Sequence, residues 1–314
     1  MKIVAQMDDM STIKFAFDST FAMLLAAQER GHEVFYYLPS ELSYDFTQKK
    51  LSANVRKVKL RNDANNYYQI ISQKITDLTE FDVVLLRQDP PFNMHYITST
   101  YLLERIADKV LVLNNPAEVR NCPEKLMVSM FPDLMAPTLF SKDLNQIKEF
   151  YQTHGDIILK PLYGNGGESI MLIKKGDPNF NSILEVMIGY YDGLILAQKF
   201  LPQVSEGDKR IILFDGEVAA KFLRIPKQNE IVSTMVRGGG IRQTELSKRD
   251  REICDRLGPE LKKRGLFFVG IDVIDGHLTE INVTSPTGFS AAKLIENKEL
   301  AQEFIMRVEQ KIAK

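Results

Sequence analysis

The sequence predicts an α/β protein of two or three domains, with an open parallel sheet first and mixed α+β structure after it. Short apolar segments alternate with segments of helical length and periodicity in the first part of the chain, as in consecutive βαβ units. Further on, glycine-punctuated hairpins replace this alternation. The length of 314 residues also exceeds what one hydrophobic core usually supports. We therefore expect a Rossmann-like N-terminal domain followed by an α+β part.

The first predicted unit is a strand, a helix and a second strand. Residues 2–6 read as a buried strand. Ser19 or Thr20 can cap the helix, and Gly31 ends it before a strand at 33–38. Three more strands and a helix extend the unit into an open parallel sheet: strands 55–60, 81–87 and 110–113, and a helix from about 93 to 108.

This sheet lacks the dinucleotide-binding fingerprint, because Asp8 and Asp9 follow its first strand in place of a glycine-rich turn. A rigid turn with two prolines, residues 87–92, lies just past the carboxyl end of another strand. Open α/β sheets usually place ligands at that edge. Arg87 can clamp a substrate carboxylate there, or it can pair with Asp89 for local structure.

A domain boundary is expected at residues 114–116, where the composition shifts. Beyond it we expect a helix that carries Lys125, a helix at 143–154 and a strand that ends at Lys160. A loop with three glycines, 164–167, follows between two apolar strands, so it is neither a Walker loop nor a Rossmann turn. It is either a plain hairpin turn or a cradle of backbone N–H groups for phosphate, with the two lysines as point charges.

Three later segments complete the central and C-terminal parts. Residues 194–202 read as a strand that runs into a connector. Asp208 opens the next strand, which turns back at Asp215 and Gly216. Residues 226–242 lose all periodicity, and a loop of this length commonly acts as a lid.

A β-hairpin is predicted at residues 269–283, where apolar and polar residues alternate on both sides of an Asp-Gly pair. Glu280 and Asn282 are two positions apart and therefore share one face of their strand. Whether Asp272 joins them depends on the turn. A two-residue turn would set Asp272 opposite Thr279 and away from the other two.

A three-residue loop, 274–276, would instead set Asp272 opposite Leu278 and on the shared face. Asp272, Glu280 and Asn282 would then form a hard-oxygen site suited to Mg²⁺ and completed by substrate phosphates. In the other reading the face carries ordinary solvated acids. The hairpin alone leaves both readings open.

Composition excludes several classes of function. The 40 basic and 41 acidic residues nearly cancel, which gives no electrostatic case for binding nucleic acid or an anionic membrane. The two cysteines, Cys122 and Cys254, are far apart and indicate a reducing compartment. The N-terminus does not resemble a signal peptide, and no apolar run is long enough to span a bilayer. We expect a cytoplasmic protein.

Taken together and in order, the motifs resemble those of ATP-grasp ligases, and most closely the bacterial glutathione synthetase family. The resemblance runs over nearly the whole chain and is carried by residues 18–28, 87–92, 158–162, 207–210, 268–272 and 278–287. It implies three domains: an N-terminal substrate domain at 1–121, a central lid domain at 122–201 and a C-terminal catalytic domain at 202–314.

The resemblance also implies roles for individual residues. Groups expected to contact ATP are Lys125, Lys160, Gly164, Asn165, Gly166, Gly167, Gln198, Lys199, Phe200, Leu201 and Asp208. Arg210, with Lys160, would stabilise the transferring phosphoryl group. Mg²⁺, with Mn²⁺ as the alternative ion, would be held by Asp272, Glu280 and Asn282. Substrate contacts would come from Arg87, Arg210, Arg224, Asn282, Ser285 and Thr287.

The implied reaction joins γ-glutamylcysteine to glycine through an acyl phosphate, and the implied assembly is a homotetramer. One region departs from the family pattern, because Thr234 and Gly240 stand where the lid loop usually carries Asn and Arg. Two alternatives remain open: a ligase for another peptide and amine, or a nucleotide-binding regulatory protein without turnover. The second conflicts with the complete set of Lys160, Arg210, Glu280 and Asn282.

Overall fold

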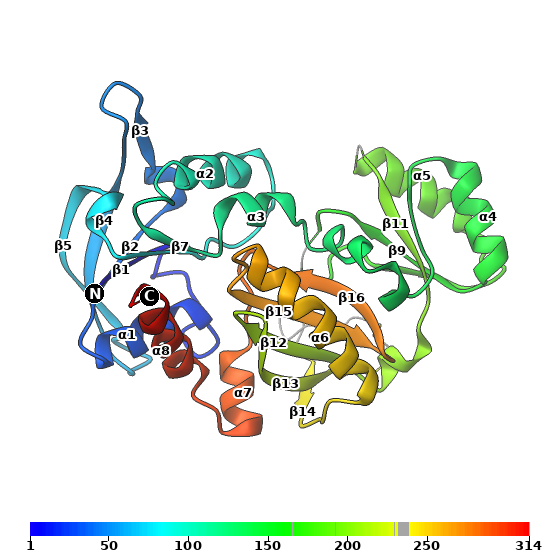
Figure 1. Ribbon diagram of the computed structural model, residues 1–314. Helices are drawn as coiled ribbons and strands as arrows, with labels where there is room; N and C mark the ends of the chain where they lie inside the picture. Colours follow the sequence, from blue (N-terminus) through cyan, green and yellow to red (C-terminus); the bar gives the residue numbers. More distant parts are fainter. Residues whose placement is uncertain (165, 192, 229, 232–238, 314) are drawn as a thin grey trace.

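Three sheets organise the described part of the chain in the computed structural model (Figure 1). The structure describes residues 1–164, 166–191, 193–228, 230–231 and 239–313. Two residues singled out in the sequence, Asn165 and Thr234, lie outside these ranges, as do residues 229 and 232–238 of the expected lid segment. In the described part of the chain, no helix combines the length and apolarity that a membrane crossing requires.

The first sheet has seven strands, in the order β3-β4-β2-β1-β6-β7 with β5 beside β4. Its parallel part confirms the expected βαβ organisation and consists of β1 (Lys2–Gln6), β2 (Glu33–Tyr37), β6 (Val83–Leu86) and β7 (Leu111–Leu113). The other part is antiparallel and consists of β3 (Ser43–Asp45), β4 (Lys50–Leu60) and β5 (Tyr68–Asp77).

The expectation of a wholly parallel sheet was therefore wrong at the strand predicted for 55–60. This strand is the second half of β4 and runs antiparallel to β2. Only β3 and a short 3₁₀ helix (Pro39–Glu41) lie between them, and a parallel connection would need a longer crossover. The sequence analysis missed β5, because its apolar residues Ile70, Ile71 and Ile75 are exposed and do not follow the period-two alternation of a half-buried strand.

The helices of the N-terminal part differ from the prediction at two points. Asp18 caps α1 (Ser19–Glu29), because its side chain accepts a hydrogen bond from Phe21 N at 2.6 Å; Ser19 and Thr20 lie inside the helix. Lys125 does not lie on a helix. It occupies a turn between α3 (Pro116–Asn121) and a 3₁₀ helix (Met127–Met130), since Pro123 disfavours helical backbone just before it. The remaining helix, α2 (Met94–Glu104), lies at the predicted place.

The second sheet forms a separate antiparallel lobe with its own apolar core. Its strands are β8 (Thr138–Ser141), β9 (Ile157–Pro161), β10 (Met171–Ile173) and β11 (Ile195–Lys199). Its helices are α4 (Leu144–His154) and α5 (Phe180–Tyr190). The glycine-rich segment connects β9 to β10, which confirms the predicted strand-loop-strand arrangement.

The third sheet has the order β14-β13-β12-β15-β16. Its strands are β12 (Asp208–Phe214), β13 (Glu217–Ile225), β14 (Gly240–Arg242), β15 (Phe268–Ile274) and β16 (His277–Asn282). Three helices belong to the same part of the chain. They are α6 (Lys248–Lys263), between β14 and β15, and α7 (Phe289–Glu296) and α8 (Leu300–Ile312), after β16. The two large apolar cores contain side chains of both the first and the third sheet, and α8 returns to pack on α1.

Asn114 joins the first and third sheets through three buried hydrogen bonds. Its Nδ2 donates to the carbonyl oxygens of Phe268 and Val283, each at 2.8 Å, and its Oδ1 accepts from Phe268 N at 2.8 Å. The side chain is 5% exposed. One amide group therefore satisfies three backbone groups, at the first residue of β15 and directly after the end of β16. These two strands carry the predicted metal ligands.

The substitution Asn114→Ala should destabilise the protein by about 2–4 kcal/mol, because it leaves buried backbone groups without their partner. Urea unfolding followed by circular dichroism measures the effect. Asn145→Ala serves as the control, since Asn145 is exposed at the start of α4, and it should change stability by no more than about 0.5 kcal/mol. Equal stabilities for the two variants would contradict the bridging role.

Candidate active site

The predicted metal hairpin folds with neither of the two registers considered from the sequence. Asp275 and Gly276 form a two-residue turn with positive φ values of 48° and 69°, and Ile274 faces His277. A β-bulge then inserts Thr279 as an extra residue, so that Asp272 pairs with Glu280. Thr279 Oγ1 donates to Asp272 O at 3.1 Å and closes the bulge. The bulge brings Asp272 and Glu280 to one face despite the short turn.

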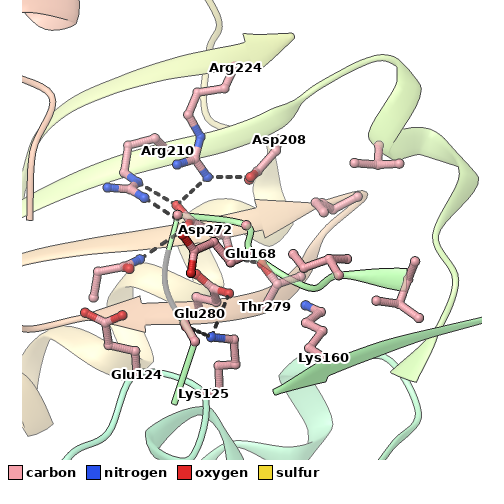
Figure 2. A pocket seen from close by; sticks show the side chains of 18 of the residues that line it. Glu124, Lys125, Lys160, Glu168, Asp208, Arg210, Arg224, Asp272, Thr279 and Glu280 are labelled. Carbon is pink, nitrogen blue, oxygen red and sulfur yellow. Dashed lines mark hydrogen bonds and ion pairs between the residues drawn. The ribbon is translucent and has the colours of Figure 1, made fainter. Parts of the chain in front are cut away.

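Asp272 lies at the centre of a cluster of two arginines and two aspartates (Figure 2). Arg210 donates to both of its carboxylate oxygens, with Nε at 2.5 Å and Nη2 at 3.0 Å. Arg224 Nη2 lies 2.9 Å from Asp272 Oδ1 and also pairs with Asp208. The antiparallel register fixes this pattern, because Arg210 on β12 lies opposite Asp272 on β15, and Asp208 lies opposite Arg224 on β13.

The environment moves the pKa values of the two acids in opposite directions. Burial would raise the pKa of Asp272, but the guanidinium groups of Arg210 and Arg224 outweigh it and lower the pKa. Burial dominates at Asp208 and raises its pKa to about 6, although Arg224 partly opposes the shift. Asp272 is thus the anion that holds the two buried arginines together.

The two predicted phosphate lysines approach the cluster from other elements. Lys160, near the end of β9, is buried, and burial lowers its pKa. Lys125 donates to the carbonyl oxygen of Gly164 and lies 3.8 Å from Glu280 Oε1. Lys125 therefore connects the glycine-rich loop to β16, the strand that carries Glu280. Figure 2 shows the contact between Lys125 and Glu280.

A cavity of about 430 Å³ lies between the second and third sheets and unites most of the predicted site. The described residues of the predicted set that line it are Lys125, Lys160, Gly164, Gly166, Gly167, Gln198, Lys199, Phe200, Leu201, Asp208, Arg210, Arg224, Asp272, Glu280, Asn282, Ser285 and Thr287. Asn165 lies outside the described residues. The Gln198 side chain donates to Thr138 Oγ1 at 2.9 Å.

Arg87 does not line this cavity. Its Nε donates to Thr20 Oγ1 at 3.0 Å, its Nη2 donates to Pro286 O at 2.8 Å, and its guanidinium lies 5.2 Å from the centre of the Phe268 ring. Among the described residues no carboxylate lies within ion-pair distance of Arg87, so it does not form the ion pair with Asp89 that the sequence also allowed. In this structure Arg87 supports the backbone of the turn that carries Ser285 and Thr287.

Sequence reasoning missed Glu124 and Thr284, which both line the cavity. Thr284 Oγ1 donates to Glu124 Oε1 at 2.7 Å, and burial raises the pKa of Glu124. The carbonyl oxygen of Glu124 also accepts from Ile281 N at 3.1 Å. The available signal was its position next to Lys125, and the helix wrongly predicted there would have pointed the two side chains apart.

The donor set fits a hard divalent cation completed by substrate. In the described residues no three His, Cys, Asp or Glu side chains gather as a ready metal cage. Two carboxylates, Asp272 and Glu280, face the cavity together with the amide of Asn282, whose Nδ2 donates to Asp272 Oδ2 at 3.2 Å. Mg²⁺ usually takes one or two protein carboxylates and fills its octahedron with phosphate oxygens and water. These residues therefore fit a Mg²⁺ ion whose coordination is completed by substrate phosphates and water, and they do not form a complete metal site by themselves.

The fold and the site define an ATP-grasp ligase. The profile of the prokaryotic glutathione synthetase ATP-grasp domain matches residues 124–297, and that of the corresponding N-terminal domain matches residues 1–120. Among solved structures, the D-cycloserine synthetase DcsG has a TM-score of 0.70 at 13% identity, with 99% of each chain covered. The ATP-grasp ligase PsnB has a TM-score of 0.64 at 15% identity, covering 100% of this chain and 98% of its own. At these identities the two structures support the fold alone.

The chain belongs to the prokaryotic glutathione synthetase family. It is 47% identical over 313 residues to the glutathione synthetase of Rhodopseudomonas palustris, covering 100% of this chain and 99% of that protein. It is 48% identical over 309 residues to the glutathione synthetase of Brucella melitensis biotype 1, covering 98% of each. The expected ligase class and fold are confirmed.

Asp272→Asn should destabilise the protein by about 3–5 kcal/mol at neutral pH, because it leaves two buried guanidinium groups without their shared anion. The pKa of Asp272 is lower in the folded chain than its ordinary value of 3.8, so its stabilisation is complete above that value and is lost only as pH falls further. Urea unfolding at pH 8, 7, 6 and 5 should therefore give a constant difference from the unsubstituted protein. Asp255→Asn, on the exposed face of α6, is the control. A difference that already disappears between pH 8 and 6 would contradict the assignment.

Proposed function

We propose that this ligase makes glutathione from γ-glutamylcysteine and glycine at the expense of ATP, through an acyl phosphate. The observation that carries the proposal is the convergence of Lys125, Lys160 and Arg210 with Asp272 and Glu280 on one cavity, in a chain that matches glutathione synthetases over its full length. Positive charge for phosphates and oxygen ligands for a metal thus meet beside the turn that carries the hydroxyl groups of Ser285 and Thr287.

We assign ATP to the part of the cavity between the second and third sheets. Lys125 and Lys160 hold its phosphates, with Gly164 to Gly167 folding over them through backbone N–H groups. The backbone of residues 198–201 receives the adenine, and Asp208 lies near the ribose. Bound Mg²⁺, held by Asp272, Glu280 and Asn282, would neutralise phosphate charge. PsnB has been solved with Mg and ADP, which supports this use of the shared fold; Mn²⁺ would suit the same oxygen ligands.

The chemistry needs positioning and charge neutralisation rather than a protein nucleophile. An oxygen of the C-terminal carboxylate of γ-glutamylcysteine attacks the γ-phosphorus of ATP, and ADP leaves. Arg210 stabilises the charge on the transferred phosphoryl group. The deprotonated amine of glycine then attacks the acyl carbon, the amide bond forms, and inorganic phosphate leaves. Asn282, Ser285, Thr287 and Arg224 contact the peptide substrate, with Arg87 positioning the turn at Pro286.

Domain limits, location and assembly belong to the same proposal. We divide the chain into 1–121 for the substrate, 122–201 as the lid and 202–314 as the catalytic part. The separate core of the second sheet supports a central unit that moves by itself. We further propose a cytoplasmic homotetramer, which light scattering would test. The departure at Thr234 lies outside the described residues and the one at Gly240 begins β14; together they make the amine the least constrained substrate.

Glu280→Gln should lower turnover by on the order of a hundredfold or more, since it removes one of two charged oxygen ligands at a phosphate site. The stability of the variant should stay close to that of the unsubstituted protein, because Glu280 is only half-buried. Turnover is measured as ADP release at saturating ATP with Mg²⁺ titrated from micromolar to millimolar. An unchanged rate and Mg²⁺ requirement would remove Glu280 from the site.

ADP release from γ-glutamylcysteine and ATP should depend on added glycine, because a closed site protects the acyl phosphate until the amine arrives. A coupled ADP assay and mass spectrometry of the product make the measurement. Alanine is the comparison substrate, since one added methyl group is discriminated by only about 1–3 kcal/mol. Equal use of several amines would indicate a broader ligase. ATP binding without turnover on any γ-glutamyl peptide would contradict the enzyme.

A further inference from the structure

Glu124 is the one acid of the cavity wall that, in the described part of the chain, is neither exposed nor within 4 Å of a cation. Asp208 and Asp272 pair with arginines, and Glu280 lies 3.8 Å from Lys125 Nζ. Glu124 instead accepts one neutral hydrogen bond, from Thr284 Oγ1 at 2.7 Å. Glu124 is half-buried, and a carboxylate that is partly withdrawn from water without a counter-charge is costly to maintain, so its presence calls for a cationic ligand. Asp89 and Glu168 are exposed and do not carry this cost.

A small side cavity lies against Glu124. It has a volume of about 20 Å³, room for one group the size of a water molecule or an ammonium. Polar groups of its lining come from Glu124, Lys125, Gly164 and Thr284. Among these residues only Lys125 carries a positive charge. Phe92 and Tyr163 also line the cavity, and their rings stack with centroids 6.4 Å apart. Aromatic faces next to a carboxylate favour an organic cation.

The positive charge nearest to this cavity is already engaged. Lys125 donates to the carbonyl oxygen of Gly164 and faces Glu280, and we have assigned it to the phosphates of ATP. Figure 2 shows Glu124 beside Lys125, at the end of the site near Glu280. Arg210 and Glu280 also act on Glu124 electrostatically from across the site. The small cavity thus adjoins the place where the acyl phosphate would form.

We propose that Glu124 binds the ammonium group of the acceptor amino acid and so sets where the amine waits beside the acyl phosphate. The inference rests on the proposed function and adds a residue to it. The peptide substrate also carries an ammonium group, but that group is many bonds from the reacting carboxylate. Glu124 lies next to Lys125 in sequence and holds Thr284, the residue before Ser285, so it adjoins the reacting end of the substrate.

The first test is Glu124→Gln, which keeps the shape of the side chain and removes its charge. The KM for glycine should rise roughly 10- to 100-fold, the loss expected for a hydrogen bond to a charged group. The KM values for ATP and γ-glutamylcysteine should change by less than about threefold, because neither of these substrates contacts Glu124 in the proposal. Glu118→Gln is the matched control, because Glu118 lies on the preceding helix and pairs with Arg264 instead of facing the cavity. It should leave all three KM values unchanged.

Hydroxylamine separates amine recognition from the other steps, because it is a small nucleophile that is neutral at pH 7.5 and traps acyl phosphates as hydroxamates. With ATP and γ-glutamylcysteine, Glu124→Gln should form hydroxamate at the rate of the unsubstituted enzyme while its use of glycine falls. Loss of both reactions to the same extent would overturn the inference, as would a raised KM for γ-glutamylcysteine with that for glycine unchanged.

A second variant keeps the test decisive if the amide variant does not fold. Thr284→Val removes the hydroxyl that holds the carboxylate but keeps the charge of Glu124, so the KM for glycine should rise several-fold and that for ATP should stay constant. Equal increases in both would indicate a structural role and overturn the inference. Failure of the unsubstituted protein to make glutathione would count against the proposed function itself, a result distinct from an unaltered glycine KM in the variants.

Discussion

The pairing of Asp272 with Arg210 and Arg224 is the interaction on which the rest of the site depends. The three side chains come from three adjacent strands of one antiparallel sheet, with β12 between the other two. Each is almost completely buried, and a buried charge without its partner costs several kcal/mol. A slip of one residue between these strands would turn a charge into the apolar core and leave its partner alone. The ion pairs therefore fix the register that also places Asp208, Glu280 and Asn282.

The bulge at Thr279 solves a geometric conflict in the same sheet. The Asp-Gly turn favours a tight two-residue connection, which by itself would direct Asp272 and Glu280 to opposite faces. One extra residue restores the alternation, and Thr279 stabilises the bulge by donating its hydroxyl to the carbonyl oxygen of Asp272. Bulges cannot be read from period-two alternation alone, because alternation assumes one residue per partner. For this reason the sequence analysis considered only two registers for the hairpin, and the structure has a third.

Local chemistry was predictable from the sequence where strong short-range signals exist. The strand that carries Lys160, the strand that begins at Asp208 and the glycine-rich connection lie where periodicity and turn residues placed them. Long-range contacts were not predictable. The turn at Lys125 follows from Pro123, but its approach to Gly164 depends on how two lobes meet. Arg87 shows the same limit, because its partners Thr20 and Pro286 are 67 and 199 positions away in the chain.

In the proposed mechanism the guanidinium group of Arg210 contacts the phosphoryl group of ATP, and in the structure the same guanidinium group contacts Asp272. The guanidinium groups of Arg210 and Arg224 are both ion-paired in the structure, Arg210 with Asp272 and Arg224 with Asp272 and Asp208. If Arg210 transfers its contacts to phosphate oxygens, Asp272 loses part of its counter-charge and needs another cation, which a divalent ion supplies. Phosphate and metal binding would then each remove the cost that the other creates. Coupling of this kind would make nucleotide affinity depend on the metal without any change of fold, because one carboxylate would serve two roles.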